Sequence, residues 1–321
     1  TGLLFDVMLH VGTLVAICIV YYKDIIRLVI EFIGMLIDGG YNLVTWMQKR
    51  RGKDGAYRHV IYNSYRKMVM LVIVSTIPTG IIGYVGADLV TAASEVLIVP
   101  GICLIITAAL LFVCDRIPEG HKKPKQTSYA NAFIIGICQG VATLPGLSRS
   151  GTTITACVLN GLDRRFAVKY SFIMSIPAIL GAMVLQLKNI GSEALVRTDL
   201  IHYAIGMAVA AVVGYICIKT MLVIVKKRKF KFFSIYCLIV GIVSIIGYFV
   251  IWQLRKERHL PERKHPERRL PAEKVLQTEE EKAVLHRHLH GVQNCCFLHF
   301  WHLQFSFLSE ILEKAELWEM H

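Results

Sequence analysis

The polar residues best suited to chemistry lie together in one short stretch, Pro145-Gly146-Leu147-Ser148-Arg149-Ser150-Gly151-Thr152-Thr153. The stretch interrupts a long apolar segment, where an arginine costs about 2.5–3.5 kcal/mol on insertion scales and needs a partner or an aqueous pocket. Pro145 and Gly146 break the helix, and a helix that begins after them exposes free N–H groups at its positive end, which attract anions. The planar guanidinium of Arg149 matches phosphate oxygens. The stretch therefore predicts a phosphate site open to a lipid-borne substrate.

Short hydroxyl side chains surround this arginine, and glycines lie on either side of it at 146 and 151. The hydroxyls are those of Ser148, Ser150, Thr152 and Thr153. The alternative interpretation is structural: Arg149 would reach to the membrane interface, and the hydroxyls would satisfy the broken helix. The density of donors around one arginine favours the anion site.

Two other phosphate-handling motifs are absent from the sequence. Lipid phosphatases of the vanadium-haloperoxidase type need a His six residues after the arginine and an Asp four residues later, but these positions hold Thr155 and Leu159. No Walker A loop occurs either. Nor do the cysteines show the CxxC spacing of a zinc site, and seven of the nine lie in apolar stretches.

The elements that must position the stretch are long apolar runs. Apolar residues make up 55% of the 321 residues and charged residues 18%, which excludes a disordered chain and argues against a soluble enzyme. Runs long enough to cross about 30 Å of hydrocarbon predict an all-α polytopic membrane protein with six transmembrane helices, at about 3–22, 68–86, 96–114, 168–187, 202–225 and 232–252.

Residues 129–162 do not fit a simple crossing. Each apolar arm on either side of the break is short, which predicts a re-entrant helical hairpin. Lysines 122, 123 and 125 precede the segment, and Arg164, Arg165 and Lys169 follow it. Because basic flanks favour the cytoplasmic side, both ends of the hairpin are expected on that side.

The net charge of +13 lies entirely within residues 1–254, because residues 255–321 hold eleven basic and eleven acidic residues. In a membrane protein such an excess lies in cytoplasmic loops, here 48–67 and 226–231, so nucleic acid is not an expected partner. Residues 23–37 predict an amphipathic helix. We therefore expect a membrane domain at 1–254 and a polar, His-rich, disordered tail at 255–321.

Several segments resemble one family of membrane phosphatases. Gln139 to Thr153 is similar to the second signature of the undecaprenyl-diphosphate phosphatase family, the bacitracin-resistance type. Phe5 to Leu14 resembles the segment after that family's first signature. Arg164 to Ala167 and Ser171 to Pro177 also fit, and the resemblance covers about 3–252.

The resemblance implies a multi-pass enzyme of the bacterial plasma membrane. It would hydrolyse undecaprenyl diphosphate to undecaprenyl phosphate and phosphate, which recycles the lipid carrier for cell-wall synthesis and confers bacitracin resistance. It implies Arg149, Ser148 and Thr153 as catalytic residues. The implied substrate-binding residues are Gln139, Gly146, Ser150, Gly151 and Thr152. The expected partners are the polyprenyl diphosphate, bilayer lipid and a second copy in a homodimer.

The family is built from inverted repeats with a divalent cation, Mg²⁺ or Ca²⁺, at the site. Its first signature holds two glutamates four residues apart and then Ser-Ser-Thr-Gly-His, and no such string occurs in these 321 residues. The repeat pair is therefore expected to be truncated, with the metal-binding carboxylates upstream of Thr1 and the activity of this chain impaired.

Two alternatives stay open. A polyprenyl-phosphate transporter or flippase would use the same phosphate cradle and would not need the acidic signature. His10 lies in an apolar span next to Leu9 and Val11. It is either a hydrogen-bonded interior histidine or a residue that lines the site.

Overall fold

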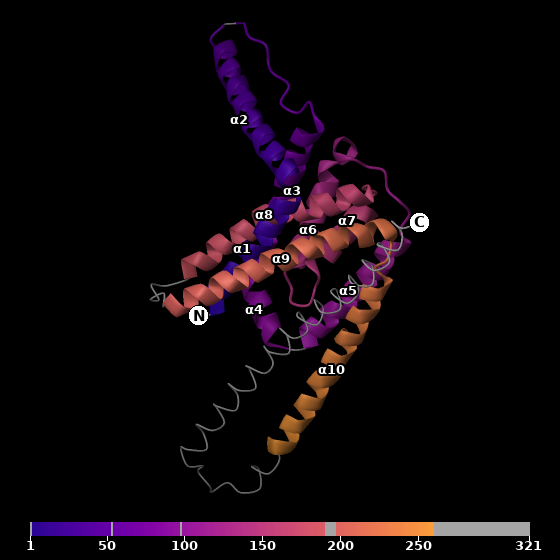
Figure 1. Cartoon of the computed structure of the whole chain (residues 1–321). Coiled ribbons are helices and arrows are strands. Elements are labelled where there is room, and N and C mark those ends of the chain that lie inside the picture. The colour runs from indigo at the N-terminus through magenta and orange to yellow at the C-terminus, as the bar shows by residue number, and fades with distance from the viewer. Residues whose placement is uncertain (1, 53, 97, 190–196, 260–321) are drawn as a thin grey trace, which may run out of the picture. The chain divides into compact units, whose positions relative to one another are not determined.

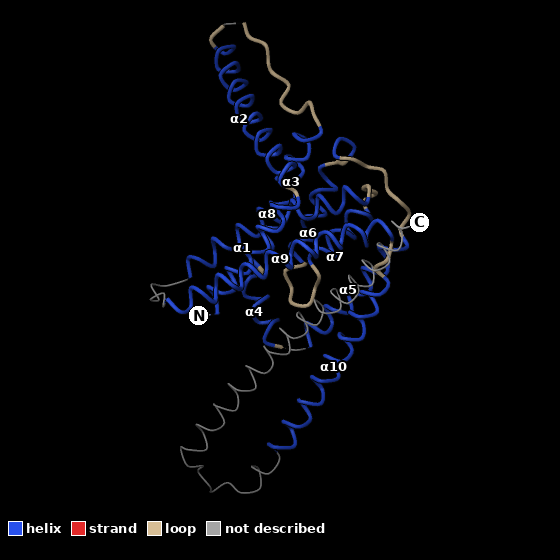
Figure 2. Tube along the Cα trace, viewed as in Figure 1, coloured by secondary structure: helices blue, strands red, loops and turns tan. Residues whose placement is uncertain are grey.

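The computed structural model describes residues 2–52, 54–96, 98–189 and 197–259, and all of the regular elements in these ranges are helical (Figures 1 and 2). The helices are α1 (Gly2–Val20), α2 (Tyr22–Arg50), α3 (Ser64–Val85), α4 (Ala87–Glu95), α5 (Ile98–Arg116), the short 3₁₀ helix η1 (Pro124–Gln126), α6 (Tyr129–Val141), α7 (Arg149–Leu159), α8 (Arg164–Asn189), α9 (Arg197–Lys227) and α10 (Lys231–His259). The all-α polytopic prediction is confirmed.

Within the ranges that the structure covers, six helices are long and apolar enough to cross a membrane: α2, α3, α5, α8, α9 and α10. Five of them match predicted spans. The first predicted span, 3–22, forms α1, whose described side chains, Met8–Val20, are apolar. The sixth candidate is instead α2, so the prediction of an amphipathic helix limited to 23–37 was wrong in length.

The greater length of α2 has its cause in a neighbouring helix. Asp38 and the glycines after it mark an end of the apolar pattern, but Arg66 of α3 neutralises the acid at 2.6 Å and also pairs with Glu31 at 2.9 Å. Compensated charges no longer oppose burial of the helix. The predicted basic loop 48–67 is correspondingly shorter, because the side chain of Asn63 caps α3 by accepting from the Arg66 N–H.

The predicted hairpin is present as α6 and α7. Its two ends meet: Lys122 N–H donates to the Gly161 carbonyl at 3.1 Å, and Asp163 N–H donates to the Lys122 carbonyl at 3.0 Å. The segments that enter and leave the hairpin therefore lie side by side, so the chain leaves the hairpin at the same end at which it entered. This is the geometry of a re-entrant hairpin.

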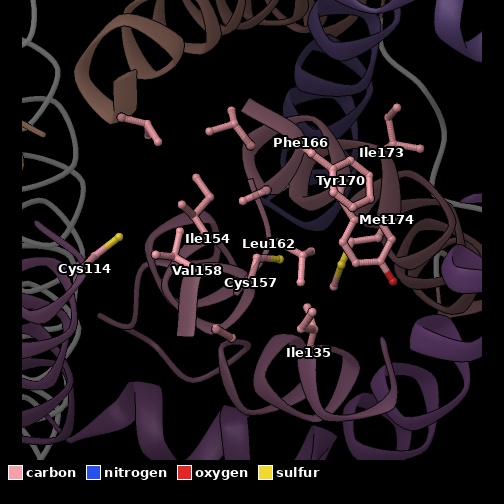
Figure 3. Packing of buried hydrophobic residues seen from close by; sticks show 14 of the residues in the cluster. Cys114, Ile135, Ile154, Cys157, Val158, Leu162, Phe166, Tyr170, Ile173 and Met174 are labelled. Atoms are coloured by element: carbon pink, nitrogen blue, oxygen red, sulfur yellow. The ribbon is translucent and has the colours of Figure 1, made fainter. Parts of the chain in front are cut away.

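The hairpin is held by α3, α5 and α8, which pack against its two arms. Figure 3 shows Ile154 and Cys157 of α7 together with Tyr170 and Met174 of α8 and Ile135 of α6, all fully buried in one cluster. Close packing of these buried side chains fixes the position of the break between the arms.

The chain divides into two units, Thr1–Ile242 and Val243–His321. In the second unit the structure describes the end of α10, up to His259. The predicted tail at 255–321 lies outside the described residues apart from this helix end, and its boundary with the membrane domain stays a prediction.

Replacement of Gly136 by alanine should destabilise the contact between α3 and α6. A Cβ at this position would collide with the Ser75 carbonyl and lie 2.7 Å from Pro78 Cγ, and Thr79 donates to the Gly136 carbonyl at 2.8 Å. We expect a loss of about 1–3 kcal/mol, as for other overpacked cores, measured by thermal unfolding in detergent. Gly80→Ala is the control, because a Cβ there meets nothing within 4 Å; equal melting temperatures for the two variants would contradict this packing.

Candidate functional site

The break between α6 and α7 rests on one threonine of α5. Thr107 Oγ1 accepts the Ser148 N–H at 3.1 Å and lies 3.3 Å from the Gly146 carbonyl and 2.9 Å from the Cys103 carbonyl, to which its hydroxyl can donate. Thr107 is 2% exposed. It therefore supplies the hydrogen bonds that the interrupted backbone would otherwise lack inside a membrane.

Position 146 requires glycine for two reasons. Its φ is +85°, in the left-handed region, and a Cβ would collide with the carbonyl oxygen of Pro100 in α5. The turn thus lies directly on the α5 backbone. The loop between the arms is drawn in tan in Figure 2.

The first turn of α7 leaves donors open. Ser148 caps the helix: its Oγ accepts the Gly151 N–H at 3.2 Å, and its carbonyl accepts the Thr152 N–H at 2.8 Å. The N–H groups of Arg149 and Ser150 have no acceptor among the described residues. These two orphan donors lie at the positive end of the helix, where an anion binds best.

The Arg149 side chain adds a full charge to this end. It is half-buried, and across the described part of the chain its guanidinium forms neither an ion pair nor a hydrogen bond. A partly desolvated arginine without a counter-ion is unfavourable unless a ligand or water compensates its charge. Arg149 and the two free N–H groups together form a site suited to an anion.

The neighbouring hydroxyls differ in what they can reach. Thr153 is 1% exposed, and its Oγ1 lies 2.9 Å from the Arg149 carbonyl and against the Ser171 Oγ of α8. It therefore fixes the first turn of α7 to α8 rather than facing outward. The Oγ1 of Thr152 is buried without a hydrogen-bond partner in the described structure. The hydroxyl proton of Ser148 stays available, because its oxygen acts as the acceptor in the cap.

Gln139 lies on the other arm of the hairpin and is 1% exposed. Its Nε2 donates weakly to the Met174 carbonyl at 3.4 Å, and its Oε1 has no partner among the residues described. His10 lies in α1, which packs against α9, α8 and α2. The roles of both residues at the site stay predictions.

Gly146 and the run from Ser148 to Thr153 form the break and the first turn of α7, and their roles at the site stay predictions. Sequence reasoning missed Thr107 and Ser171, which hold the two ends of that run. Each is a single hydroxyl residue in an apolar span, and such residues commonly bond the carbonyl four positions earlier in their own helix. No local pattern showed that these two would serve a different segment.

The described residues do not present a ligand set for the divalent cation that the sequence resemblance implies. Where the structure is described, no group of three His, Cys, Asp or Glu side chains comes close enough to hold a metal ion. Two acidic side chains that could serve as metal ligands, Glu31 and Asp38, instead form ion pairs with Arg66.

The amino-acid sequence is similar to those of known proteins. The family model described as bacitracin resistance protein BacA matches residues 1–243. A protein of Methanosphaera stadtmanae named undecaprenyl-diphosphatase is 38% identical over 246 residues, which is 77% of this chain and 84% of that protein. A protein of Methanobrevibacter smithii with the same name is 39% identical over 250 residues, again 77% and 84%.

A third relative of the same name, from Alkaliphilus metalliredigens, is 36% identical over 244 residues, covering 76% of this chain and 84% of the relative. The residues matched by the family model, 1–243, include both arms of the hairpin and the break between them. The chain belongs to the bacitracin resistance protein BacA family.

Proposed function

We propose that this protein is an undecaprenyl-diphosphatase, which hydrolyses undecaprenyl diphosphate to undecaprenyl phosphate and phosphate. One observation carries the proposal: the unpaired guanidinium of Arg149 lies at the open N-terminus of α7, at a break inside a membrane-embedded hairpin. A site of this kind suits a diphosphate whose hydrocarbon tail stays in the bilayer. The names of the relatives support the same substrate.

In this reaction, water provides the oxygen that joins the terminal phosphorus, and the bridging P–O bond breaks. The lipid keeps one phosphate, and inorganic phosphate leaves. Negative charge accumulates on the oxygens of the transferring phosphoryl group and on the bridging oxygen. The Arg149 guanidinium and the N–H groups of Arg149 and Ser150 are placed to stabilise that charge, and Ser148 and Ser150 can add hydroxyl donors.

These donors are fixed before the substrate arrives. Ser148 is held by its cap to Gly151 and by Thr107, and Thr153 fixes the next turn to α8. A dipole or donor that needs no reorganisation stabilises a transition state more strongly than mobile water does. The divalent cation stays a prediction, because the first-signature carboxylates that would hold it are not among these residues.

We further propose that the protein works in the cell membrane of a bacterium. We also propose that it forms a homodimer there. The six apolar crossing candidates establish a multi-pass membrane protein. The finer location is inferred from the role of undecaprenyl phosphate as a wall-precursor carrier.

The decisive experiment measures phosphate release from undecaprenyl diphosphate by the protein purified in detergent. Release above a protein-free blank is expected. If no phosphate appears while lipid crosses between the leaflets of a vesicle, the transporter alternative replaces this proposal. A rate far below that of the Methanosphaera stadtmanae relative, assayed in parallel, would support the predicted impairment.

Arg149→Lys should reduce phosphate release by about a hundredfold or more, since a point charge cannot replace a bidentate fork at the transferring group. The measurement is initial rate at saturating substrate. Arg51→Lys is the matched control, because Arg51 is exposed at the end of α2, outside the site. Near-normal turnover by Arg149→Lys would contradict the clamp role.

Ser148→Ala and Ser128→Ala both remove a helix cap from the hairpin. Ser148 caps α7 and Ser128 caps α6, each by accepting the N–H of the residue three positions on. Each variant should lose about 1 kcal/mol of stability, measured by thermal unfolding. Phosphate release should fall by about tenfold or more in Ser148→Ala alone; an equal fall in both variants would show that capping, and not the site, limits the rate.

A further inference from the structure

A cavity lies where the hairpin begins and ends. Its volume is about 300 Å³, and it opens between the first turns of α2, α3 and α8 and the segment before α6. The backbone bonds between Lys122 and residues 161–163 fix its position at the base of both arms. Arg149 lies at the opposite end of α7, a helix of eleven residues that is about 16 Å long. The cavity is therefore separate from the proposed phosphatase site.

The acidic groups of this cavity are already engaged. Asp24 Oδ1 accepts from Lys169 Nζ at 2.9 Å and from the Tyr65 hydroxyl at 3.1 Å. Asp163 caps α8, because its Oδ1 accepts the Phe166 N–H at 2.9 Å. Asp24 is thus paired with Lys169, whereas Asp163 keeps its negative charge in the same wall.

The same wall holds two further cations. Lys123 and Arg165 both line the cavity and are exposed to solvent. Among the residues that the structure describes, neither forms an ion pair. With Lys169, the lining has three cations against the carboxylates of Asp24 and Asp163, a net charge of +1 that attracts an anion.

The inner wall is apolar. Met68 is 3% exposed and Phe166 is 8% exposed, and the ring of Tyr65 lies beside them. α3 and α8, which supply these side chains, are both crossing candidates, and the cavity lies at their first turns. A cationic mouth above an apolar wall, at the depth where a crossing helix begins, matches the boundary between the headgroup and the chain of a phospholipid.

We propose that this cavity binds a phosphate group, supplied by an anionic phospholipid of the membrane. Lys123 and Arg165 contact the phosphate oxygens, and the lipid chain runs along Met68 and Phe166. Because the occupied cavity joins Lys123 and Pro124, before the hairpin, to Arg165, after it, the bound lipid links the two roots of the hairpin. The proposal is independent of phosphatase turnover.

The test uses Lys123→Glu/Arg165→Glu in the full chain, with Arg51→Glu/Lys125→Glu as a control of equal charge change. The two control residues are exposed and do not line the cavity. Each protein is purified from vesicles that contain equal amounts of phosphatidylglycerol and phosphatidylcholine, and the retained lipid is measured by native mass spectrometry. Circular dichroism and thermal unfolding establish that both variants are folded.

The control should retain phosphatidylglycerol in preference to phosphatidylcholine, and the cavity variant should retain about tenfold less of it. A second arm measures the rise in melting temperature caused by inorganic phosphate at constant ionic strength. If this rise is lost in the cavity variant while lipid retention is the same in both, the phosphate site is supported, with a soluble source. Equal lipid retention and an equal response to phosphate in both variants would overturn the proposal.

Discussion

A backbone that stops partway across a membrane must find partners for its free N–H and C=O groups within the protein, and the hairpin depends on how this is done. At the break, Thr107 accepts the Ser148 N–H and lies within donating distance of the Gly146 carbonyl. Gly146 fits because it has no Cβ to collide with Pro100. One side of α5 is thus the support on which the turn is built. Since water is not available in hydrocarbon, each of these contacts replaces one that a soluble protein would leave to solvent.

The same constraint explains why the site is open. Ser148 satisfies the N–H of Gly151, and its carbonyl satisfies that of Thr152, but nothing described satisfies those of Arg149 and Ser150. An unpaired guanidinium beside them costs free energy in the empty protein. An arriving anion removes that cost, so its binding is favoured by the state of the site as well as by the contacts it makes. A carboxylate placed beside Arg149 would stabilise the empty protein and weaken this effect.

Contacts between helices use the same chemistry elsewhere in the first unit. Thr79 donates to the Gly136 carbonyl, Tyr170 to the Leu71 carbonyl and Ser234 to the Ala108 carbonyl, at 2.7–2.9 Å. Membrane helices gain little from apolar contact with one another, because lipid chains are equally apolar. Close approach through small residues and side-chain hydrogen bonds therefore contributes much of their association. The Cβ-free surface of Gly136 and the hydroxyl of Thr79 act together at a single crossing of α3 and α6.

The limits of prediction follow from the range of each interaction. The hairpin could be predicted because arm length and the Pro145-Gly146 break are encoded within a few residues. The length of α2 could not, since Glu31 and Asp38 are compensated by an arginine 35 and 28 residues away. Thr107 lies 41 residues from Ser148, whose N–H it accepts, and Ser171 lies 18 residues from Thr153. A hydroxyl in an apolar helix has the same appearance in the sequence whether it bonds its own helix or supports a distant break, so three-dimensional proximity has to decide between the two roles.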